Sequence, residues 1–149
     1  MKENVAKTAL AASILAALLG NTGIAQASST CFTGGSLAAT AGTTPVAYDV
    51  YGVNCGAGNT TLTGSVSLKT GTQVQLQIGH ENTTQSTLVS DTVTSAANCG
   101  TPSAATTAVS GGTGFYTVVV NKTTTAATTY DMTLTCNAGA PALVTQINR

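Results

Sequence analysis

The segment at residues 72–78 has the clearest alternation of apolar and polar residues in the chain, and this pattern restricts the chain to few folds. Three apolar residues fall on one side and three glutamines on the other: Val74, Leu76 and Ile78 against Gln73, Gln75 and Gln77. A period of two is typical of a β-strand that buries one face and exposes the other. The sequence therefore predicts a half-buried strand at this position.

Further segments rich in strand-forming residues occur along the chain, at residues 46–55, 60–69, 86–94, 115–121 and 130–136. Residues 138–149 form a tail that could add one edge strand. Turn-forming residues separate these segments, and no long helical pattern appears after residue 27. Short strands at intervals of about ten residues are typical of sandwiches. We expect an all-β fold, an antiparallel β-sandwich of the jelly-roll or immunoglobulin-like kind with about seven strands.

The first 27 residues have the features of a secretory signal peptide. Lys2 and Lys7 precede an almost wholly apolar stretch at residues 8–19, and Ala25-Gln26-Ala27 matches the small-x-small cleavage pattern. The stretch is too short to anchor the protein in a membrane, and it is apolar on all sides, which argues against a helix packed on the domain. We therefore expect a cleaved helical leader, a secreted protein in the periplasm or outside the cell, and no membrane anchor after cleavage.

These patterns predict four parts of the chain. Residues 1–27 are the signal peptide, residues 28–44 a small, polar and flexible N-terminal arm, and residues 45–137 the sandwich domain. Residues 138–149 are a C-terminal tail or edge strand. The arm is expected to be loose because it is rich in glycine and small residues, with Cys31 as its only tether.

Four cysteines follow the leader: Cys31, Cys55, Cys99 and Cys136. An even number in an exported chain predicts two disulfides, and no pair has the C-x-x-C spacing of redox or zinc sites. Three pairings exist in principle. The favoured one joins Cys55 to Cys136 and Cys31 to Cys99, because Cys55 and Cys136 end the two clearest strands near either end of the domain.

Few charges remain after the leader. Three basic residues stand against four acidic ones, a formal net charge of −1: Lys69, Lys122, Arg149 and Asp49, Glu81, Asp91, Asp131. The chain has no basic patch, so nucleic acid and anionic membranes are poor candidate partners. The polar surface must come largely from hydroxyl groups, including 28 threonines after residue 27. Uncharged strand edges favour pairing with other molecules, so self-association through edge strands is expected.

Three segments resemble the bacterial pre-peptidase C-terminal domain. They are Asp49-Val50-Tyr51-Gly52-Val53, then residues 114–120, which read GFYTVVV, and residues 130–135, which read YDMTLT. The resemblance extends over about residues 46–136 and rests mostly on core positions. It implies a small secreted β-sandwich with a non-catalytic, accessory role in secretion or surface attachment, and it implies no catalytic residue. Relatives usually follow a catalytic domain, whereas only the leader and the arm precede the sandwich here.

The residues that could support catalysis or bind a metal form no recognisable motif. His80 is the only histidine, and a typical zinc site needs three or four ligands. A hydrolase would need His80 beside a serine, or a pair of carboxylates, and no G-x-S-x-G motif is present. We interpret His80 as a loop residue at the end of a strand. A calcium site built from Asp49 or Asp131 with backbone carbonyls remains an alternative.

The sequence thus predicts a non-enzymatic secreted sandwich with a structural or adhesive role at a surface, in a matrix or on a fibre. We predict no catalytic residue, no cofactor-binding residue and no metal-binding residue. The alternative is a small extracellular module that binds carbohydrate or a partner protein, with or without calcium.

Overall fold

The computed structural model describes residues 27–40, 47–56, 58, 61–81, 84–111 and 115–148. The predicted signal peptide, except for its last residue, lies outside this part. The described residues form ten strands and no helix. The strands are β1 (Ser28–Leu37), β2 (Tyr48–Asn54), β3 (Thr61–Thr70), β4 (Val74–His80), β5 (Thr84–Gln85), β6 (Val89–Asp91), β7 (Val109–Ser110), β8 (Phe115–Asn121), β9 (Thr128–Cys136) and β10 (Ala142–Asn148).

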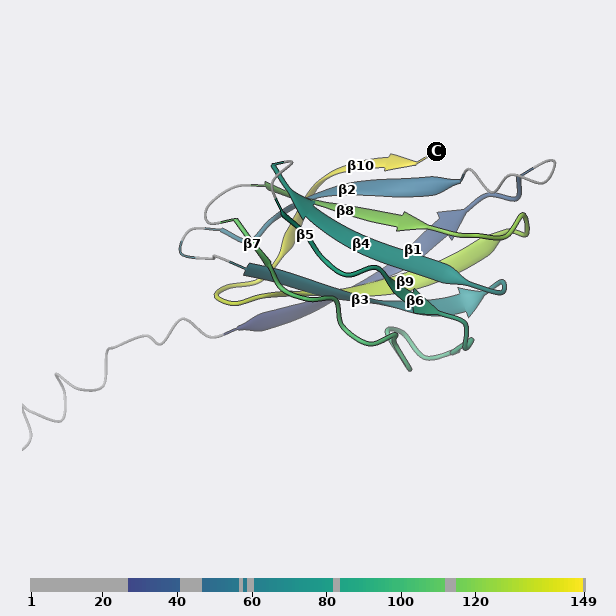
Figure 1. Cartoon of the computed structure of the whole chain (residues 1–149). Helices are drawn as coiled ribbons and strands as arrows, with labels where there is room; N and C mark the ends of the chain where they lie inside the picture. The colour runs from purple at the N-terminus through teal and green to yellow at the C-terminus, as the bar shows by residue number, and fades with distance from the viewer. Residues whose placement is uncertain are drawn as a thin grey trace, which may run out of the picture.

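The strands build two sheets that lie one over the other (Figure 1). The four-stranded sheet has the order β1-β9-β3-β7, and the six-stranded sheet has the order β10-β2-β8-β4-β5, with β6 also paired to β4. Neighbouring strands within each sheet run antiparallel. The predicted all-β antiparallel sandwich is therefore confirmed.

The space between the sheets is filled by side chains that alternation directs inward. In the six-stranded sheet they include Leu76, Ile78 and Val118, each 0% exposed. In the four-stranded sheet they include Leu62 and Leu134, also 0% exposed. This is the face that the sequence predicts for the 72–78 strand, so its alternation identified the core side correctly.

Strand β3 is buried from Gly64 to Leu68, on both of its faces. The long segment between β6 and β7 runs along the edge of this strand. Its backbone N–H groups at Ser95, Ser103 and Thr106 donate to the carbonyls of Leu68, Val66 and Gly64 at 2.7–2.9 Å. The segment therefore supplies hydrogen-bond donors to backbone carbonyls along the edge of β3 that faces away from β9, where a regular strand would otherwise pair.

The expectation of a flexible arm at residues 28–44 is wrong for its first ten residues. They form β1, which pairs with β9 from Ser28↔Cys136 to Leu37↔Thr128. One of the glycines that suggested a loose segment has a packing role, since a Cβ atom on Gly35 would lie 2.3 Å from the ring of Tyr130. Glycine lets the β1 backbone approach that ring, and backbone pairing stabilises a strand that lacks an apolar pattern.

The structure also corrects the number and the length of the strands. The predicted strand at residues 86–94 is reduced to β6, three residues long, and β5 and β7 have two residues each. Strands of two or three residues are too short to show an alternation of apolar and polar residues in the sequence. The C-terminal residues form the edge strand β10, so the sandwich extends beyond residues 45–137 at both ends.

Candidate binding face

The outer face of the six-stranded sheet carries a row of aliphatic side chains. The register places Ile147 of β10 opposite Val50 of β2, and Val50 opposite Val119 of β8. The inward residues of β2 and β8 are buried, so alternation directs Val50 and Val119 outward. Ile147 is 51% exposed. These three residues form an apolar row that crosses three neighbouring strands.

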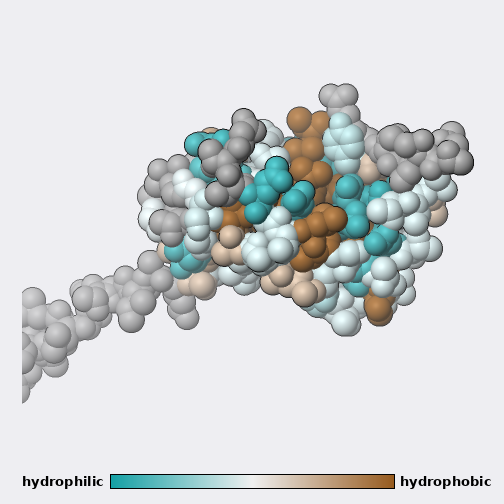
Figure 2. Space-filling model, viewed as in Figure 1, coloured by the Kyte–Doolittle hydropathy of each residue, from teal (hydrophilic) through white to brown (hydrophobic). Residues whose placement is uncertain are grey.

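Figure 2 shows hydrophobic side chains gathered in a band on this side of the molecule, with hydrophilic ones on both sides of the band. The outward residues of β2, β4, β8 and β10 in the described structure include no Asp, Glu, Lys or Arg. We call this surface the outer face. It is both uncharged and partly apolar.

A second row of the outer face consists of small residues. Thr145, Gly52, Thr117 and Gly79 lie opposite one another across β10, β2, β8 and β4. Because Gly79 has no side chain, the surface of β4 is hollowed beside Thr117. A hollow of about 280 Å³ lies here.

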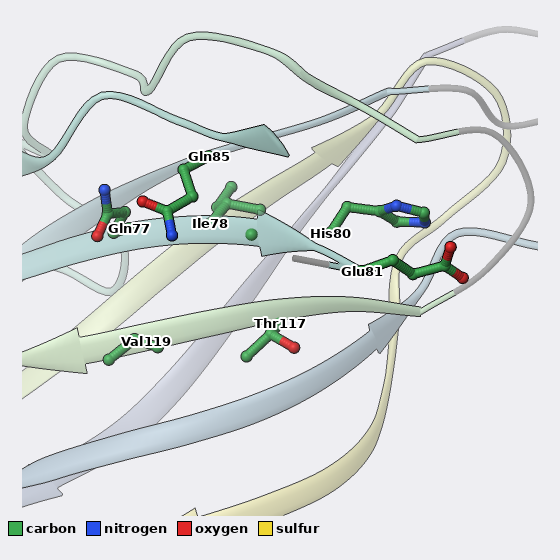
Figure 3. A pocket seen from close by; sticks show the side chains of 8 residues that line it. Gln77, Ile78, His80, Glu81, Gln85, Thr117 and Val119 are labelled. Atoms are coloured by element: carbon green, nitrogen blue, oxygen red, sulfur yellow. The ribbon is translucent and has the colours of Figure 1, made fainter. Parts of the chain in front are cut away.

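The hollow is lined by both apolar and polar residues. Gln77 and Gln85 lie side by side at one end of the hollow, and Glu81 lies at the other end (Figure 3). Thr117 and Val119 line it from the neighbouring strand β8. The Gln77 side chain donates to the carbonyl of Ser86 at 3.2 Å, which holds it over β4. The lining therefore offers amides, one hydroxyl and one carboxylate along the direction of the strand.

Three of the four Asp and Glu side chains in the described part of the chain are buried and have structural partners. Asp91 accepts from the N–H groups of Leu68 at 2.8 Å and Val93 at 3.0 Å. Asp131 accepts from the N–H groups of Gly34 at 3.2 Å and Cys99 at 2.9 Å. Asp49 bonds to two tyrosines, described below. Their burial explains why few charges reach the surface.

Glu81 is the exposed carboxylate of the described residues. It follows β4 with a φ of 44°, a left-handed backbone that non-glycine residues seldom adopt. This turn places the charge at the end of the hollow (Figure 3).

The two described lysines are engaged with the protein itself. Lys122 is 2% exposed and donates to the carbonyls of Ala38 and Ala126. Lys69 donates to the carbonyls of Ala96 at 2.7 Å and Ala97 at 2.9 Å, and lies 3.6 Å from Asp131. Both side chains therefore fix loops, and they contribute little charge to the surface.

His80 ends β4, as predicted, but it is not a loop residue. Its side chain is 3% exposed, and its ring lies 4.8 Å from the ring of Tyr116. A Cβ atom on Gly111 would lie 2.3 Å from the imidazole, so the backbone there packs directly on the ring. His80 faces the interior because it continues the inward series of Leu76 and Ile78.

Asp49, Tyr51 and Tyr130 form a buried polar network between the sheets. The hydroxyl of Tyr130 donates to Asp49 at 2.5 Å, and the two tyrosine hydroxyls lie 2.6 Å apart. The second carboxylate oxygen of Asp49 is buried without a hydrogen-bond partner. Burial raises the pKa of Asp49, although the hydrogen bonds from Tyr130 and Tyr51 act to lower it. Burial likewise raises the pKa of Tyr130 and of Tyr51.

The raised pKa of Asp49 predicts how this residue makes stability depend on pH. Between the ordinary value of 3.8 and the raised pKa, the folded state binds more protons at Asp49 than the unfolded state does. The contribution of Asp49 to stability is therefore largest at low pH and is lost as the pH rises through the raised pKa. Since Asp49→Asn cannot ionise, wild type should lose stability relative to this variant over that interval.

Thermal unfolding of both proteins between about pH 3 and pH 8 would measure this difference. Glu81→Gln, at an exposed carboxylate, serves as the control. A wild type that gains stability relative to Asp49→Asn as the pH rises would contradict the prediction.

The structure contains two disulfides, as predicted, and they join Cys31 to Cys99 and Cys55 to Cys136. This is the pairing that the strand positions favour. Cys55 and Cys136 are buried at 3% and 0% exposure, and they connect the two sheets through β9 and the end of β2. Cys31 joins β1 to the long segment between β6 and β7. Two such bonds indicate an oxidising environment.

The described residues contain no group of three His, Cys, Asp or Glu side chains placed to hold a metal ion. No helix within them is long and apolar enough to cross a membrane. No family model and no curated protein matches this chain. The resemblance to the pre-peptidase C-terminal domain therefore stays a prediction.

Proposed function

We propose that this chain is an exported, non-enzymatic β-sandwich with a structural or adhesive role at a surface, in a matrix or on a fibre. The proposal rests on the outer face, where an apolar row crosses three of the four strands and no outward residue is Asp, Glu, Lys or Arg. Contact with another uncharged surface would release water from apolar area without removing a charge from water. A contiguous apolar patch on a soluble domain commonly marks such a contact.

Two further features support this proposal. The disulfides suit a protein that works outside the cytoplasm, as the predicted leader does. The buried carboxylates are already occupied by backbone N–H groups or tyrosine hydroxyls, so their positions are explained by folding.

Adhesion can be measured as adsorption of the purified mature protein to an uncharged, methyl-terminated surface on a quartz crystal microbalance. Val119→Lys puts a charge in the apolar row and should weaken adsorption about tenfold, because the ammonium group must lose water on contact. The matched control is Val93→Lys, since Val93 is 60% exposed but follows β6, outside the four strands. Equal adsorption of the two variants would contradict a role of the outer face.

The hollow favours a second candidate function, the binding of a neutral oligosaccharide. Gln77, Gln85 and Thr117 could donate to and accept from sugar hydroxyls, and Glu81 could accept from two of them. A glycan array separates the two functions, because a sugar bound in the hollow should be lost in Gln85→Ala and retained in Val93→Lys. A thermal shift with added calcium tests whether the protein also binds that metal.

A further inference from the structure

Free strand edges invite pairing with other molecules, and natural sheets usually protect them. Three of the four sheet edges in the described structure are protected. Beside β3, the two-residue β7 and the long connecting segment occupy the edge. Beside β4, the edge consists of β5 and β6, two and three residues long. At β1, the register shifts between Phe32 and Gly35, and the Cys31–Cys99 disulfide ties the strand down.

The fourth edge, β10, lacks these protections over most of its length. It has seven residues and lies at the border of the six-stranded sheet, beside β2 (Figure 1). Its pairing with β2 is regular from Thr145↔Gly52 to Asn148↔Asp49. Residues 142–148 include no charged residue and no proline. In an antiparallel ladder, alternate residues direct their N–H and C=O groups away from the neighbouring strand, so β10 presents such groups at the edge.

We propose that β10 pairs antiparallel with β10 of a second copy of this chain and joins the two six-stranded sheets into one. Two properties of the strand favour a second copy as the partner. An uncharged strand can lie beside itself without like-charge repulsion. A two-fold axis perpendicular to the sheet also keeps the outer face outward in both copies, so Ile147 of each copy lies on the same side.

This contact differs from the adhesive contact and goes beyond the proposed function. It uses the backbone edge of β10, whereas adhesion uses the side chains of the outer face. A two-fold contact between identical edges closes on itself and gives a dimer, not a fibre. The dimer would place two outer faces side by side, which would strengthen attachment through two linked contacts.

Sedimentation velocity of the mature protein over a range of concentrations tests the proposal. Wild type should convert from monomer to dimer as its concentration rises. Ile147→Lys places two like charges near the joined edges and should weaken the dimer about tenfold or more. Val93→Lys is the matched control for an added surface charge. Val119→Lys, two strands away from the edge, disturbs the outer face without touching the edge.

The variants distinguish this proposal from the proposed function. Dimers in wild type, Val93→Lys and Val119→Lys, with a weakened dimer in Ile147→Lys, would support edge pairing whether or not adsorption is observed. A monomeric wild type, an unaffected Ile147→Lys dimer, or a dimer lost only in Val119→Lys would each overturn it. If Ile147→Lys does not fold, hydrogen exchange of wild type decides. Alternate amides of β10 should exchange more slowly at high protein concentration, and concentration-independent exchange would refute the pairing.

Discussion

Replacing Cys55 and Cys136 together with alanine is expected to lower the free energy of unfolding by about 4–5 kcal/mol. The disulfide closes a loop across a sequence separation of 81 residues, and such a loop greatly restricts the unfolded chain. Because typical domains are stable by only about 5–15 kcal/mol, this loss would leave the fold marginal. Urea denaturation of wild type and variant under oxidising conditions measures the difference.

The second disulfide provides the matched control. Cys31 and Cys99 close a loop of similar separation, 68 residues, so chain entropy alone predicts a nearly equal loss. The two bonds differ in burial, since Cys55 and Cys136 lie in the core whereas Cys31 is exposed. Alanine leaves a cavity only at the buried bond, and that should add to the loss there. A larger loss for Cys31→Ala/Cys99→Ala would contradict this account.

The sequence was most informative where a residue's position alone determines its environment. Alternation identifies the inward side of a strand, which is why the core residues Val74, Leu76 and Ile78 could be predicted. Cysteines at the ends of clear strands likewise indicated which pairs could meet. These inferences need only local geometry.

Strand β1 could not be predicted in this way, because its stability comes from a distant partner. Residues 28–37 contain one buried apolar residue, Leu37, and no apolar alternation. The strand forms because β9 supplies a ladder and because Gly35 fits over the ring of Tyr130. Both depend on residues about 100 positions away in the sequence, and a local pattern does not report them.

Only part of the outer face could be predicted from the sequence. The run at residues 115–121 is rich in β-branched residues and suits a central strand, and β8 does lie between β2 and β4, with Phe115 and Thr117 exposed on its outer side. The outer face emerges only from the register that sets Val119 beside Val50 and Ile147. The alternation of those residues was a usable signal, but the sequence could not show that they lie in one row.

The surface carries fewer charged groups than the composition suggests. The sequence shows four acidic residues after the leader, and the structure buries three of them. The surface is therefore even less charged than the sequence indicates, which strengthens the proposal of contact with uncharged partners. The buried carboxylates in turn should matter greatly for folding.

Asp131 should show this importance most clearly, since it connects three elements from its place on β9. One oxygen accepts from Gly34 in β1, and the other accepts from Cys99 and lies near Lys69. Asp131→Ala leaves two backbone N–H groups and a cation without this partner, and should lower the free energy of unfolding by about 3 kcal/mol. Urea denaturation measures it, with Glu81→Ala, an exposed acid, as a control expected to change stability by less than about 0.5 kcal/mol.

Asp131→Asn refines the test, because the amide keeps one acceptor but turns a donor toward one of the N–H groups. The stability of Asp131→Asn should lie between that of Asp131→Ala and that of wild type. Loss of Asp131 should also loosen the segment around Cys99, so the Cys31–Cys99 bond should be reduced faster by a small thiol while Cys55–Cys136 is unchanged. Equal stability of Asp131→Ala and Glu81→Ala would show that Asp131 does not hold β1 and the long connecting segment against β9.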